Sequence, residues 1–136
     1  MARRVTAFFY GLFMDPEALE AKGFKPMNVR RACVERFALK IGDRATLVPD
    51  QNGCVHGTIA SLTHDEIDRL YSEPSVAAYR PEPVLARLED GTAEVALCFN
   101  LPTAPQGKTN SDYAAALRAV ARRLGLPDAY IESIGG

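Results

Sequence analysis

The sequence has no excess of either charge and lacks the short motifs that identify a chemistry at once. Sixteen basic and seventeen acidic residues leave a formal net charge of −1 over 136 residues. This balance gives no electrostatic basis for binding nucleic acid or an anionic membrane. The glycine-rich patterns of nucleotide-binding loops are absent, and so is the Gly-x-Ser-x-Gly turn of many hydrolases. We therefore expect neither nucleic acid nor a membrane as a partner.

Cysteine and histidine are also scarce, which limits metal and nucleophilic chemistry. Cys33, Cys54 and Cys98 are an odd number, lie among apolar residues and form no Cys-x-x-Cys pair. We interpret them as reduced, buried thiols in a cytoplasmic protein. Cys54 and His56 would share one face of a strand, but no third ligand follows at a metal-binding spacing. We therefore predict no metal site, while an acyl hydrolase that uses Cys54 and His56 stays an alternative.

No apolar run is long enough to cross a bilayer. The opening residues MARRVTAFFYGLFM resemble a signal peptide, but Gly11 interrupts the run and Asp-Pro-Glu follows where a cleavage site needs small residues. We predict that Val5–Tyr10 is a buried strand instead. No repeat or shift in composition divides the chain, so we expect one domain over residues 1–136. Nothing in the pattern predicts an oligomeric state.

Three helices have clear start signals. Residues 15–23 begin with a capping Asp and a Pro at the first helical position, and end in Gly. A Thr-x-x-Glu capping box at Thr63 starts a second helix, which must end just before Pro74. Ser111 can cap a last amphipathic helix, whose apolar stripe includes Tyr113.

The remaining periodicity is that of strands. Alternating apolar residues over 29–41 predict a half-buried strand, and residues 45–49 and 54–62 predict two more. An Asp-Gly turn at 90–91 predicts a hairpin over residues 84–100. Strands that cluster in mid-chain with few helices between them indicate an α+β protein. Its sheet should be mostly antiparallel or mixed, and it can curl into a barrel.

Two stretches can carry chemistry. In FFYGLFMDPEAL a buried strand breaks at Gly11 and runs into a helix, so that consecutive unpaired N–H groups can converge on an anion. In LYSEPSVAAYRPEPV (Leu70 to Val84), Glu73 follows a helix C-terminus, where the helix dipole disfavours a carboxylate. Partial burial there would raise the pKa of Glu73 towards the range of a general base. Each stretch alone also fits an ordinary turn or a solvated surface acid.

Three segments follow one another in an order that is more specific than any one motif. They are FYGLFM (Phe9 to Met14), HGTIASLTHDEIDRLYSEP (His56 to Pro74) and YRPEPVLARLEDG (Tyr79 to Gly91). In this order they resemble the γ-glutamylcyclotransferase-like family. The resemblance implies a small mixed β-barrel flanked by helices, with a cavity faced by the first-strand loop and the mid-chain acid. It also implies cleavage of a small γ-glutamyl amide substrate to 5-oxoproline and a free amine, with no cofactor.

The resemblance assigns roles to six residues. Glu73 would take the proton from the substrate α-ammonium and deliver it to the leaving nitrogen. Main-chain N–H groups of the first-strand loop would hold the α-carboxylate. Tyr79 either lines the cavity through its hydroxyl or is a cross-strand aromatic residue. The loop residues are Tyr10, Gly11, Leu12 and Phe13.

Departures from the family pattern bear on catalysis. Leu12 stands where the family has Ser or Thr, which leaves only main-chain donors in the loop. Tyr71 and Pro74 depart from the family's acidic segment, while Glu73 matches its acid in a gapless alignment. A non-catalytic protein that binds a γ-glutamyl or carboxylate ligand on the same fold is therefore the alternative.

Overall fold

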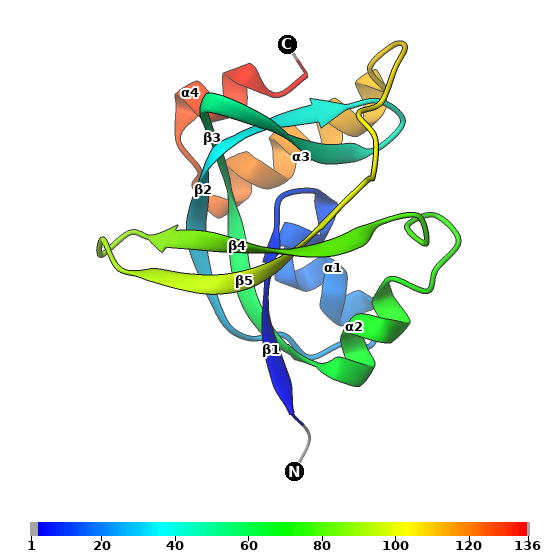
Figure 1. The fold of residues 1–136 in the computed structure, drawn as a ribbon, viewed down its shortest axis with the longest axis vertical. Helices are drawn as coiled ribbons and strands as arrows, with labels where there is room; N and C mark the ends of the chain where they lie inside the picture. The colour runs from blue at the N-terminus through cyan, green and yellow to red at the C-terminus, as the bar shows by residue number, and fades with distance from the viewer. Residues whose placement is uncertain (1–2, 136) are drawn as a thin grey trace.

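The computed structural model describes residues 3–135 and consists of a barrel with helices packed around it (Figure 1). Within these residues five strands close the barrel in the order β1-β3-β2-β4-β5. The strands are β1 (Arg4–Phe9), β2 (Met27–Ile41), β3 (Ala45–Thr63), β4 (Arg80–Leu88) and β5 (Ala93–Asn100). The helices are α1 (Pro16–Ala21), α2 (His64–Leu70), α3 (Ser111–Leu124) and α4 (Asp128–Ser133), with one 3-10 turn, η1 (Leu12–Met14).

The barrel is mixed because one of its seams is parallel. β1 pairs antiparallel with β3 along its whole length. On its other side β1 runs parallel to β5, through Ala7 and Phe8. The pairs β2–β3, β2–β4 and β4–β5 are all antiparallel. The predicted class, an α+β fold with a small mixed barrel flanked by helices, is confirmed.

The ribbon of β2 and β3 is longer than predicted. Residues 45–49 and 54–62, which the pattern predicts as two strands, belong to the single strand β3. The polar segment between them has the composition of a turn but forms a bulge, where the pairing register shifts beside Arg36. At Gly53 an added Cβ would lie 2.1 Å from the Phe37 carbonyl oxygen. Glycine therefore lets the two strands stay paired through the bulge.

β1 lies in the core, as predicted. Ala7, Phe8 and Phe9 are at most 3% exposed, and Tyr10, just beyond the strand, is 5% exposed. Because β1 has a strand on each side, the chain passes directly from the core of the barrel into the loop that follows. That loop is consequently held at its start by the most buried part of the protein.

The helices begin close to their sequence signals. α1 and α2 start at the predicted caps. α3 is capped by Asn110 and not by the predicted Ser111, since the Asn110 side chain accepts the Tyr113 N–H at 3.1 Å. The amide of Asn110 also donates to the Asp43 carbonyl at 3.2 Å, a tertiary contact that the local pattern does not contain. No helix within residues 3–135 is long and apolar enough to cross a membrane.

The prediction of three buried thiols is wrong for two of them. Cys98 is buried, but Cys33 is half-buried and Cys54 is exposed. Apolar neighbours in sequence show that a residue lies in a strand near the core, but they do not show which face of that strand points inward.

Candidate functional site

A cavity of about 90 Å³ lies at the end of β1, beside the loop that leads into α1. Most of the predicted site residues line it, namely Tyr10, Gly11, Leu12, Phe13 and Tyr79. The predicted acid, Glu73, does not belong to its wall. Wall residues that the sequence did not mark as part of a site include Arg44, Tyr71, Phe99 and Tyr113.

The loop after β1 has main-chain N–H groups outside the sheet. The chain folds into η1, where the Met14 N–H donates to the Gly11 carbonyl at 3.0 Å. Leu12 and Phe13 take part in none of the strand pairings of residues 3–135, as predicted. Burial raises the pKa of Tyr113, and a hydrogen bond with the Leu12 main chain lowers it in part, so this hydroxyl lies at the loop. A Cβ added at Gly11 would lie 2.7 Å from the same hydroxyl, so a larger residue there would require the phenol to move.

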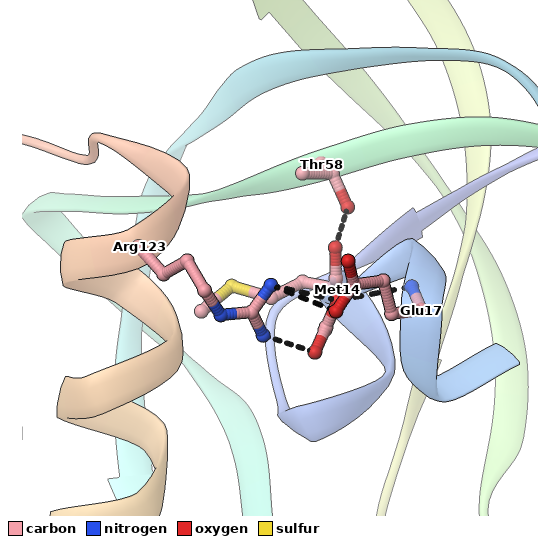
Figure 2. Close-up of polar contacts among 5 residues, drawn as sticks. Met14, Glu17, Thr58 and Arg123 are labelled. Atoms are coloured by element: carbon pink, nitrogen blue, oxygen red, sulfur yellow. Dashed lines mark hydrogen bonds and ion pairs between the residues drawn. The ribbon is translucent and has the colours of Figure 1, made fainter. Parts of the chain in front are cut away.

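Polar contacts hold the loop from two sides (Figure 2). Arg123 reaches across from α3 to the carboxylates of Asp15 and Glu17, which stand at the start of α1. On the other side, the Thr58 hydroxyl donates to the Met14 carbonyl at 2.8 Å. The start of α1 is thus fixed to α3, and the end of η1 is fixed to β3. These contacts hold the main-chain donors of the loop in place.

The polar groups of the cavity wall are mainly phenols, which belong to Tyr10, Tyr71, Tyr79 and Tyr113. The Tyr10 hydroxyl donates to the Phe99 carbonyl at 2.6 Å, and the Tyr79 hydroxyl donates to the Ala45 carbonyl. Burial raises the pKa of each phenol, that of Tyr79 to about 12. All four are therefore protonated near neutral pH and cannot serve as bases. The protons of Tyr10 and Tyr79 are already donated to these carbonyls, so the phenols of Tyr71 and Tyr113 are the ones that can donate to a ligand.

Among the described residues that line the cavity, Arg44 is the one that carries a charge. Its guanidinium is close enough to Tyr79 to lower the pKa of that phenol in part, against the larger effect of burial. Among the described residues of the wall, none supplies a carboxylate, an imidazole or a thiol. The wall therefore offers hydrogen-bond donors and one cation, which is the combination that suits an anionic group.

Glu73 lies beside this wall, and its carboxylate pairs with a lysine instead of lining the cavity. Its two carboxylate oxygens accept from the Lys22 ammonium at 3.0 and 3.1 Å. That ammonium lies over the ring of Phe13, 5.7 Å from its centroid, and Phe13 is part of the wall. From the same segment, Tyr71 reaches the cavity together with Val76 and Tyr79, and its ring stacks on Phe99 at 3.8 Å between centroids. The role of Glu73 as a base stays a prediction.

Comparison with known protein families shows to which family the chain belongs. The family model described as γ-glutamyl cyclotransferase, AIG2-like, matches residues 7–115, a range that contains the whole described cavity wall. The chain belongs to this family. Among curated proteins, none matches the chain in sequence.

Solved structures share the fold of this cyclotransferase family member at low sequence identity. The structure of a protein named γ-glutamyl cyclotransferase superposes with a TM-score of 0.83 and 16% identity, over 97% of this chain and 86% of that one. An uncharacterized human protein gives 0.82 and 16%, over 96% and 86%. YkqA from Bacillus subtilis gives 0.76 and 21%, over 96% of this chain and 52% of that one. Identities this low establish the barrel and its helices, and they assign no residue a role.

Cys54 and His56 form a pair outside the cavity wall. The Cys54 sulfur lies 3.8 Å from His56 Nε2. Burial raises the pKa of Cys54 to about 11 and lowers the pKa of His56. Near neutral pH the thiol is therefore protonated and the imidazole uncharged, which does not suit an activated thiolate nucleophile. Within residues 3–135, no three His, Cys, Asp or Glu side chains gather as a metal site requires.

The wall residues that the sequence did not reveal come from distant segments. Arg44 lies in the tight turn between β2 and β3, and no motif surrounds it. Tyr113 fits the apolar stripe of α3, so its periodicity predicts packing and conceals the position of its hydroxyl. Tyr71 stands at the end of α2, where the sequence marks it only as a departure from the family pattern. The order of segments identifies the family, but it does not show which side chains meet.

Proposed function

We propose that this family member binds a γ-glutamyl amide in the cavity and converts it to 5-oxoproline and a free amine. The observation that carries the proposal is the loop at Leu12 and Phe13, which lies outside the sheet pairing and forms part of a wall of donors. An α-carboxylate is an anion that main-chain N–H groups, phenols and Arg44 suit. The reaction is the one after which the family and one protein of similar structure are named.

The proposed reaction needs no nucleophile from the protein. The α-amine of the substrate attacks its own γ-carbonyl carbon, a new C–N bond closes the 5-oxoproline ring, and the C–N bond to the leaving amine breaks. Holding the γ-glutamyl chain in a folded conformation supplies the proximity that this attack requires. The α-ammonium loses one proton to become the attacking amine, and this nitrogen loses a second proton as it becomes the ring amide. The leaving amine takes up both protons and departs as an ammonium, so a single carboxylate can carry each of them across.

Glu73 is the carboxylate that we assign to this proton transfer. Its oxygens accept from the ammonium of Lys22, which lies over Phe13 of the cavity wall. An alkylammonium is the same kind of group as the α-ammonium of a γ-glutamyl substrate. We propose that the substrate ammonium replaces Lys22 as the partner of Glu73, which brings the carboxylate to the attacking nitrogen.

One observation favours a second candidate function, a protein that binds such a ligand without turning it over. The polar side chains of the 70–79 segment that line the cavity are the phenols of Tyr71 and Tyr79, and burial raises the pKa of each. A phenol of this kind donates a hydrogen bond to a ligand but does not remove its proton. If Glu73 keeps Lys22 as its partner in the complex, binding occurs and the ring does not close.

The experiment that separates these functions measures product and binding on the same samples. The protein is incubated with a set of γ-glutamyl compounds that differ in the leaving amine, 5-oxoproline is quantified by chromatography, and the melting temperature is recorded for each mixture. Release of 5-oxoproline supports the enzyme. A raised melting temperature without product supports the binding protein, and neither response with any compound contradicts both.

A further inference from the structure

Two thiols lie on neighbouring strands of the β2–β3 ribbon, and neither belongs to the described cavity wall. Cys33 of β2 stands opposite His56 of β3. Two positions further along β2, Glu35 stands opposite Cys54. Because side chains two positions apart on a strand share a face, Cys33 and Cys54 are diagonal neighbours on one face of the ribbon. Both are free thiols in the structure.

The two thiols are close enough to interact, and they differ in accessibility. Burial raises the pKa of Cys54 to about 11, and Cys33 adds to this rise, in part through a hydrogen bond between the two side chains. Cys54 is exposed and Cys33 is half-buried, so a reagent from solvent meets Cys54 first. The third cysteine, Cys98, is buried and its thiol donates to Asn100 Oδ1 at 3.6 Å.

A base and a hollow lie next to the pair. The Cys54 sulfur is 3.8 Å from His56 Nε2, and the His56 ring makes an edge contact with Tyr130 at 5.0 Å between centroids. Burial lowers the pKa of His56, so its imidazole is uncharged near neutral pH and can accept a proton. Cys33 and His56 also line a hollow of about 380 Å³ beside residues 125–127, which gives a small molecule room next to the thiols.

The backbone beside the pair can adjust to a covalent bond. A disulfide joins Cβ atoms about 3.5–4.5 Å apart, whereas diagonal neighbours in a regular antiparallel pair are roughly 7–8 Å apart. The strands must therefore move closer together at this point. The pairing register shifts directly after Glu35, where Arg36 has no partner in the ladder. Because a bulge locally interrupts the ladder, β2 can bend there while the pairs on either side persist.

We propose that Cys33 and Cys54 form a reversible disulfide by exchange with a small-molecule disulfide. The Cys54 sulfur attacks one sulfur of the reagent while its proton passes to His56 Nε2. A mixed disulfide forms, and the first small thiolate leaves and takes up that proton. The Cys33 sulfur then attacks the Cys54 sulfur, closes the bond between the two cysteines and releases the second small thiolate, which takes up the Cys33 proton. The protein thiols are oxidised and the reagent is reduced to two thiols.

The bond would act on the ribbon and not within the cavity. It closes a ring that contains the whole β2–β3 turn, and this turn carries Arg44 of the cavity wall. Oxidation therefore restrains the segment that positions Arg44. Since Cys54 is not an activated thiolate, exchange is slow, which suits a state that persists after oxidation better than a repeated catalytic cycle.

The test treats the whole protein with excess 2-hydroxyethyl disulfide, which contains no γ-glutamyl group and so does not depend on the proposed function. Remaining thiols are alkylated, and intact masses and tryptic peptides are measured. The wild type should lose two hydrogen atoms, with residues 32–36 linked to residues 45–69, and dithiothreitol should reverse the change. Cys98→Ala, the matched control, should form the same link.

The variants separate the steps. Cys33→Ser should retain one reagent group on Cys54, and Cys54→Ser should form no link. The two variants remove the same bond from either side, which covers the case in which one folds poorly. His56→Gln should slow the formation of the link by about tenfold or more.

Three results would overturn the proposal. They are a wild type that forms no link, a covalent dimer in place of the internal link, and a link between the same peptides that survives in either serine variant. An unchanged rate in His56→Gln would overturn the step assigned to His56.

Discussion

Two loops border the cavity, and they contribute to it in different ways. The loop over residues 10–14 lines the cavity close to where the sequence predicts it. In the loop over residues 71–79, Tyr71 lines the cavity, while Glu73 pairs with Lys22. Main-chain groups follow the path of the chain, which local patterns determine well. The direction of a side chain depends on neighbours from distant segments, so the sequence position of Glu73 does not show which partner its carboxylate faces.

The largest effect is expected where the second loop would act as a catalyst. Glu73→Gln keeps the size of the side chain but removes the basic oxygen, so turnover of a γ-glutamyl amide should fall by about a hundred- to ten-thousand-fold. Ligand affinity should change far less. The measurement is 5-oxoproline release beside calorimetric binding, with the exposed Glu20→Gln of α1 as the control. Unchanged turnover in Glu73→Gln would remove Glu73 from the mechanism.

The first loop is tested by comparing adjacent substitutions. Gly11→Val places a branched side chain where a Cβ would lie 2.7 Å from the Tyr113 hydroxyl. We expect ligand affinity to fall by about 10- to 100-fold, because the loop donors can no longer approach an anion. Leu12→Ala keeps the N–H and should change affinity by less than about threefold. Equal losses in the two variants would contradict a site made of main-chain donors, provided that both melt like the wild type.

A smaller effect is expected at Asp15, which helps to hold the first loop in place. Asp15→Ala removes the cap of α1 and the partner of Arg123, and Asp15 is only 7% exposed. We expect a loss of about 1–2 kcal/mol in the free energy of unfolding, measured by urea denaturation, together with weaker ligand binding. Asp112→Ala, at an exposed position in the first turn of α3, should cost less than about 0.5 kcal/mol. Equal costs in the two variants would show that Asp15 does not hold the loop.

The smallest effect concerns the ion pair between Lys22, at the end of α1, and Glu73 of the second loop. Lys22→Met removes the partner of Glu73, and the two side chains are 37% and 34% exposed. Pairs this accessible contribute about 0.2–1 kcal/mol. Ligand affinity should therefore rise by up to about fivefold if the substrate ammonium competes with Lys22. Lys40→Met, an exposed lysine of β2, should leave affinity unchanged. Weaker binding in Lys22→Met would mean that Lys22 itself holds the ligand.

Much of the fold follows from local patterns, and the exceptions have identifiable causes. β1, α1, α2 and the β4–β5 hairpin lie where their signals place them, because caps, prolines and an Asp-Gly turn act over a few residues. The bulge in β3 has the sequence of a turn, since the same polar residues suit both and only pairing with β2 distinguishes them.

The candidate site could be predicted only as far as its first loop. Tyr113 and Arg44 meet that loop through the closure of the barrel and the packing of α3, which no local pattern records. Glu73 and Tyr71 lie two positions apart in one segment, and the tertiary contacts with Lys22 and Phe99 set their directions. A single sequence contains no signal for either contact.

The parallel seam between β1 and β5 has a consequence for the order of folding. It joins strands from distant parts of the chain, and the bond from the Tyr10 hydroxyl to the Phe99 carbonyl spans 89 positions. Such contacts form late, because closing a long loop costs entropy before the contact can stabilise it. During synthesis, β1 therefore lacks its β5 partner until β5 has emerged from the ribosome. Since the cavity is bounded by residues of both strands, the recovery of ligand binding during refolding reports the moment at which the barrel closes.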